Sequence, residues 1–155
     1  ISEIMKSTFK ILLGIACFAL IGLTSSCSKD SGIEKKILGK WQSTSVLYQE
    51  YENGKLVSED TETCIDWYMG FNFMSEGKGQ IILYEEGESM TGQMSWVVMG
   101  DKLMITASTL ELSESMTLTI VEVKGDSMIL EVVDEYTLYG KSYKDIERCT
   151  FKKLQ

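Results

Sequence analysis

Beyond Gly39, apolar residues recur at every second position, in short runs that are separated by turn residues. The clearest run carries, at alternate positions, Ile65, Trp67, Met69, Phe71 and Phe73. A period of two puts these side chains on one face of a β-strand, and folding tends to bury a uniformly apolar face. Similar alternation continues to the end of the chain, without a long helical pattern between the runs. The pattern therefore predicts an all-β fold.

Gly, Asn, Asp and Ser have to form the turns, because the 155-residue chain contains no proline. They delimit eight predicted strands, at 40–51, 65–74, 80–85, 90–99, 102–108, 115–123, 127–134 and 142–154. Asn53-Gly54 supplies the positive φ of a tight hairpin turn, whereas residues 56–63 and 135–141 read as polar connections. An open sheet would expose two pairing edges, and closure removes them. We therefore expect an eight-stranded antiparallel up-and-down barrel after a short helical turn at residues 33–38.

The segment before the barrel has the features of an export signal. Lys6 and Lys10 give it a basic start, and an uncharged apolar run occupies residues 11–23. Such a run, roughly 13 residues long, fits the core of a signal peptide. A membrane-spanning helix needs about 20 residues, so this run is too short to be one. We expect residues 1–4 to be upstream translation, 5–26 a signal peptide, 27–32 a tether and 33–155 one domain.

The end of this segment, Gly22-Leu23-Thr24-Ser25-Ser26-Cys27, resembles a bacterial lipoprotein signal, although Thr24 stands where that family prefers Leu. The resemblance implies that Cys27 follows the cleavage site and carries fatty-acyl chains such as palmitate. Several chains, at about 0.8 kcal/mol per buried CH2, would hold the protein on a membrane. The same resemblance implies a cell-envelope lipoprotein of the outer membrane. It does not decide between the periplasmic face and the cell surface. The alternative is a secreted protein without lipid.

Composition narrows the functional classes. A net charge of -8 and the absence of a basic stripe disfavour nucleic-acid binding. The chain has no histidine, which removes the commonest general base and metal ligand. We find no nucleophile elbow, phosphate loop or metal-ligand spacing, so we expect no catalysis, no metal and no cofactor. Cys64 and Cys149 could form a disulfide beyond an oxidising membrane or stay as buried thiols, and both alternatives remain open.

Ile37-Leu38-Gly39-Lys40-Trp41 resembles the lipocalin signature, in which Gly-x-Trp follows a short helical turn. The resemblance implies that Trp41 fills the closed end of the barrel and that a basic residue near the C-terminus packs across its indole. Arg148 matches that role best, and Lys152 comes next.

More closely, residues 33–154 resemble the short lipocalin-like domains of Bacteroides-type lipoproteins. The shared elements are a Phe-rich hairpin, a Trp strand, a Gly-Asp-Lys-Leu turn and a closing aromatic-lysine strand. In this sequence they are found at 71–79, around Trp96, at 100–103 and at 149–154.

This resemblance implies a monomeric barrel that binds a small apolar or amphipathic ligand. The candidate lining residues are Trp67, Met69, Phe71, Phe73, Met94, Trp96, Leu118 and Met128. Barrels of this size can also be solid, in which case these side chains are simply the core. A solid barrel would favour the alternative, a non-catalytic protein-interaction or inhibitor module. The acidic clusters at 59–62 and 85–88 could then steer a basic partner, whose identity the sequence leaves unknown.

Overall fold

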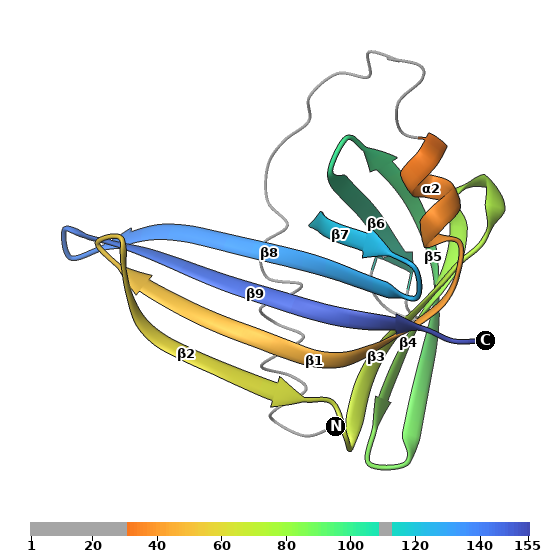
Figure 1. Cartoon of the computed structure of the whole chain (residues 1–155), viewed down its shortest axis with the longest axis horizontal. Helices are drawn as coiled ribbons and strands as arrows, with labels where there is room; N and C mark the ends of the chain where they lie inside the picture. The colour runs from red at the N-terminus through yellow and green to blue at the C-terminus, as the bar shows by residue number, and fades with distance from the viewer. Residues whose placement is uncertain (1–30, 109–112) are drawn as a thin grey trace.

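The computed structural model describes residues 31–108 and 113–155 (Figure 1). The predicted upstream residues 1–4, signal peptide 5–26, lipidated Cys27 and most of the tether lie outside the described residues. Within them the chain forms helix α2 (Ser31–Ile37) and nine strands. The strands are β1 (Gly39–Glu52), β2 (Lys55–Thr63), β3 (Trp67–Phe73), β4 (Lys78–Glu85), β5 (Glu88–Met99), β6 (Lys102–Ser108), β7 (Ser113–Lys124), β8 (Ser127–Leu138) and β9 (Lys141–Lys153). No helix in this part of the chain is long and apolar enough to cross a membrane.

Eight of these strands close into a ring. Neighbouring strands pair in the order β2-β1-β3-β4-β5-β6-β7-β8-β9, and β1 also pairs with β9. Every pairing is antiparallel. The ring therefore runs from β1 through β3 to β9 and back, which confirms the predicted eight-stranded barrel and its short N-terminal helix.

Strand β2 is the larger of two differences from the prediction, which treated residues 56–63 as a connection and did the same for 135–141, where β8 in fact continues to Leu138. Its sequence, KLVSEDTET, lacks alternating apolar residues, and almost all of it is exposed. The preceding turn has left-handed backbone at Asn53 (φ 48°) and Gly54 (φ 77°), as the hairpin prediction required. That turn aligns β2 with β1 from Glu52↔Lys55 to Ser45↔Thr63. Backbone pairing after a well-specified turn is thus sufficient to form this strand.

Four strands leave the ring together on one side. The first residues of β1, Gly39 to Gln42, pair with β3, whereas Ser45 to Glu52 pair on the same edge with β2. Likewise β8 pairs with β7 only as far as Glu131, but pairs with β9 as far as Leu138. We call the resulting four-stranded extension the arm; it comprises residues 45–52, 55–63, 131–138 and 141–148. Figure 1 shows the arm projecting away from the ring and from α2.

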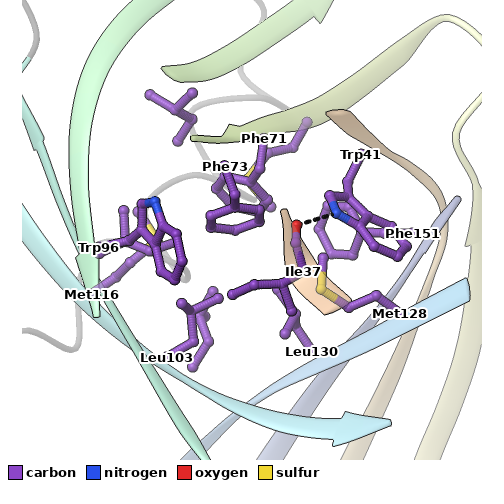
Figure 2. Packing of buried hydrophobic residues seen from close by; sticks show 14 of the residues in the cluster. Ile37, Trp41, Phe71, Phe73, Trp96, Leu103, Met116, Met128, Leu130 and Phe151 are labelled. Atoms are coloured by element: carbon purple, nitrogen blue, oxygen red, sulfur yellow. Dashed lines mark hydrogen bonds between the residues drawn. The ribbon is translucent and has the colours of Figure 1, made fainter. Parts of the chain in front are cut away.

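Helix α2 and Trp41 close one end of the ring, which we call the closed end. Ile37 is fully buried and Trp41 is 1% exposed. The indole Nε1 of Trp41 donates a hydrogen bond of 2.6 Å to the Ile37 carbonyl, drawn in Figure 2. This bond satisfies the polar atom of an otherwise apolar plug.

The cation at this plug differs from the predicted Arg148. Lys153, the direct cross-strand neighbour of Trp41, places its Nζ 5.2 Å from the ring centroid. Arg148 lies five residues earlier on β9 and on the other face, where its Nε donates to Glu131 Oε2 at 2.9 Å. Because side chains alternate along a strand, a residue in the phase of Arg148 cannot face the buried Trp41.

Candidate functional site

The predicted lining residues lie on the inner face of the ring, and most of them pack against one another. All except Trp67 are buried members of one hydrophobic cluster. Ring centroids lie 5.4 Å apart between Phe71 and Phe73 and 5.3 Å apart between Phe73 and Trp96. Figure 2 shows these rings in the same cluster as Ile37 of α2. The half of the ring next to α2 is therefore a packed apolar core.

Packing is looser at the opposite end of the ring, which we call the open end. Here the inward-facing side chains are only partly buried: Tyr48 on β1, Cys64 before β3, Trp67 on β3, Leu83 on β4 and Val132 on β8. Trp67 is thus the one predicted lining residue that is not fully enclosed. The open end differs from the closed end because the pairing of β1 with β3 stops after Gln42 and the pairing of β7 with β8 stops at Glu131.

A buried carboxylate, Glu147, lies on the inner face of β9 at this end. Two and four residues further along the same strand, Cys149 and Phe151 are in the core, so strand alternation directs Glu147 inward. The residue is 5% exposed. Neither of its carboxylate oxygens has a hydrogen-bond partner among the residues that the structure describes. Its cross-strand neighbours are Tyr48 and Val132.

The surroundings of Glu147 disfavour its ionised form. Burial is the main cause, and the negative charge of Glu62 adds to it, so the pKa of Glu147 is raised from 4.5 to about 7. Glu62 itself accepts a hydrogen bond of 2.5 Å from the indole Nε1 of Trp67. Trp67, Glu62 and Glu147 therefore form one connected group where the arm joins the ring.

The inner face of the arm continues this acidic character. By register, the carboxylates on it are Glu50, Glu52, Asp60, Glu62, Asp134, Asp145 and Glu147. The basic residues on that face, in the described chain, are Lys55 and Lys141, which lie at the far tip next to the turns. Lys141 is already paired with Glu52 at 2.6 Å. The part of the inner face nearest the ring thus carries several carboxylates and no basic side chain from residues 31–108 or 113–155.

The outer face of the arm is different, because two of its carboxylates are paired with basic residues. Arg148 binds Glu131, and Lys144 lies 3.3 Å from Glu135. Both are cross-strand pairs of opposite charge between β8 and β9, which is typical of a solvated sheet surface. The two faces of one sheet therefore present different electrostatic environments.

Cys149 follows Glu147 on the inner face of β9, and both Cys149 and Cys64 are free thiols in this structure. Burial raises the pKa of each, and the Cys149 thiol is also affected by the charges of Cys64 and Glu147. The two thiols are therefore close enough to interact, and their disulfide remains a prediction. No group of three or more His, Cys, Asp or Glu side chains within residues 31–108 and 113–155 is arranged to hold a metal ion.

Sequence reasoning missed Glu147 as a site residue. The alternation on the last predicted strand indicates it: Cys149 and Phe151 form an apolar face, and Glu147 is the next residue on that same face. Arg148, the predicted partner of Trp41, belongs to the opposite phase of the same strand.

No protein-family model and no curated protein matches the chain. Two solved structures are similar to it. A lipocalin-like protein from Bacteroides uniformis is 14% identical, over 77% of this chain and 99% of its own, with a TM-score of 0.47. An uncharacterized protein from Bacteroides eggerthii is 16% identical, over 76% of this chain and 98% of its own, with a TM-score of 0.44. At these identities no residue role passes from either protein to this chain.

Proposed function

We propose that the protein is a lipid-anchored envelope lipoprotein whose lipocalin-like barrel binds a small amphipathic ligand at its open end. The observation that carries the proposal is the set of half-buried apolar and aromatic side chains around the buried Glu147. Ligand sites in proteins are mostly apolar and contain a few placed polar groups, and this combination occurs at the open end. The packed core near α2 disfavours the central position that the lining residues had suggested.

Binding can be tested with the neutral fluorophore N-phenyl-1-naphthylamine and two variants at adjacent positions of β8. Val132 faces inward and is half-buried, whereas Val133 is 36% exposed on the outer face. We expect saturable binding to the wild type, its loss in Val132→Asp and its retention in Val133→Asp. Circular dichroism of both variants verifies folding. Equal binding by the two folded variants, or none by the wild type, would contradict the proposed site.

The anchor is tested separately by metabolic labelling with an alkyne fatty acid. Cys27 follows the small residues of the proposed cleavage site, and Cys17 lies within the apolar run and serves as a matched control. Label should be lost in Cys27→Ala and kept in Cys17→Ala. Label that persists in Cys27→Ala would refute the lipid anchor without affecting the ligand proposal.

A second candidate function is a protein-interaction module, and strand β2 favours it. This strand ends the order of paired strands, so one edge of its backbone pairs with no other described strand, and most of its side chains are exposed. Exposed edges can pair with an added strand from a partner. Val57→Pro would remove a backbone donor from β2 at its irregular position. Loss of a captured partner with unchanged fluorophore binding would support this second function.

A further inference from the structure

We propose that the polar group recognised at the open end is an organic cation, a protonated amine or guanidinium, which pairs with the carboxylate of Glu147. This inference rests on the proposed ligand site and specifies its chemistry. Glu147 is 5% exposed, and neither of its oxygens has a hydrogen bond within the part of the chain that the structure describes. A buried polar group without a partner is costly, and such exceptions in folded proteins require an explanation.

The described residues around Glu147 do not supply the missing partner. The cross-strand neighbours of Glu147 are a tyrosine and a valine, Tyr48 and Val132, and its neighbour on the same face of β9 towards the core is Cys149. The described basic side chains of this face are at the tip of the arm, several residue pairs away. Arg148, next in sequence, points to the outer face and is bound to Glu131. No donor for Glu147 is therefore found among residues 31–108 and 113–155, and a ligand that carries a donor would complete this group.

The charged groups around Glu147 determine whether a cationic or an anionic ligand is favoured. The titratable groups that face it are Glu62 and Asp60 on β2, Tyr48 and Glu50 on β1, Asp134 on β8, Cys149 and Asp145 on β9, and Cys64 before β3. When ionised, every one of them is negative. An anionic ligand such as a fatty-acid carboxylate would be repelled, whereas a cation would gain from all of them.

The neighbouring side chains further favour an organic cation over a metal ion. No set of three metal-ligating side chains is assembled in the described chain, so a metal would lack a coordination shell here. Trp67 and Tyr48 instead offer aromatic surface near the carboxylates, which suits an amine or guanidinium with an apolar body. The hydrogen bond from Trp67 Nε1 to Glu62 fixes the orientation of that indole.

The test uses three probes with the same chain and different head groups: octylamine, octan-1-ol and octanoate. Their affinities for the mature wild-type domain are measured by tryptophan fluorescence, with Trp67→Phe identifying the reporting indole. A charge-assisted hydrogen bond should make octylamine bind about ten- to a hundredfold more tightly than octanol, with octanoate the weakest. In Glu147→Gln, which keeps the shape and removes the charge, amine and alcohol should bind equally within about threefold.

Glu135→Gln is the matched control, because it makes the same change on the outer face of the same sheet, where Glu135 pairs with Lys144. It should keep the preference for the amine. The wild-type affinity for octylamine should also increase as pH rises through about 7, since protons compete with the amine for Glu147. The pH dependence should vanish in Glu147→Gln.

The outcomes separate this inference from the proposed function. If octanol binds as well as octylamine, the ligand site stands and the cation is refuted. If the amine is preferred equally by the wild type and Glu147→Gln, the assignment to Glu147 is refuted. If none of the three probes binds, both the ligand site and its cation specificity are overturned.

Discussion

Removing the charge of Glu147 should change how the stability of the fold depends on pH. In the unfolded chain the group has a pKa near the ordinary 4.5, and in the folded protein the pKa is about 7. Below pH 4.5 both states are protonated, so the group has little effect on stability. Between these two pKa values the folded protein holds a proton that the unfolded chain has released, and stability falls as pH rises. Above pH 7 the full penalty of the buried charge is present.

The magnitude follows from the two pKa values. Between pH 5 and pH 8 the shift should lower the free energy of unfolding of the wild type by about 2.5 kcal/mol through this group alone. Glu147→Gln cannot ionise and lacks this loss. Relative to the wild type, the variant should therefore gain about 2.5 kcal/mol on going from pH 5 to pH 8. Any constant cost of the amide cancels in the comparison.

Urea unfolding of both proteins at the two pH values, followed by tryptophan fluorescence, measures the double difference. Glu135→Gln serves as the control, and its difference from the wild type should vary little with pH because its exposed ion pair is weak. A constant difference between wild type and Glu147→Gln would show that Glu147 has an ordinary pKa. The physical basis of the cation proposal would then be lost.

Two substitutions test the packing of the barrel, and a labelling experiment tests the cysteine pair. Trp41→Phe removes the hydrogen bond to α2 and should lower the free energy of unfolding by about 2 kcal/mol in urea titrations; an unchanged value would contradict the plug. Gly79→Ala places a Cβ against the carbonyl oxygen of Asn72, so it should cost about 1–3 kcal/mol, and a neutral effect would mean that β3 and β4 can separate there. Protein exported to an oxidising compartment should carry a Cys64–Cys149 disulfide; maleimide labelling of both thiols in unfolded, unreduced protein would exclude it.

Local pattern was sufficient to predict most strands of the ring. The alternation Trp67, Met69, Phe71, Phe73 corresponds to β3, although Ile65, which was included in the same stripe, lies before the strand and is 78% exposed. Strand β2 was missed because its pairing depends on backbone bonds to β1 and leaves no alternation of side chains. The end of β8 was read as a connection for the same reason, since its last residues are exposed.

The site was predictable only in part, because its details depend on contacts between distant segments. Sequence identified the inward-facing residues, but only packing shows that most of them contact one another instead of lining a space. The cation above Trp41 depends on the register between β1 and β9, in which Trp41 and Lys153 are partners more than a hundred positions apart. The alternation of Cys149 and Phe151 already puts Arg148 on the other face, but the choice of Lys153 as the partner of Trp41 requires that register.

The position of α2 bears on how the molecule would stand on a membrane. The helix begins at Ser31, four residues after Cys27, and an extended tether of that length spans at most about 14 Å. With acyl chains on Cys27, the plugged base would therefore rest close to the lipid headgroups. Strand β1 leads away from that base for 14 residues, a reach of about 45 Å. A ligand would accordingly enter from the solvent, past the carboxylates of the arm, which would attract positively charged molecules.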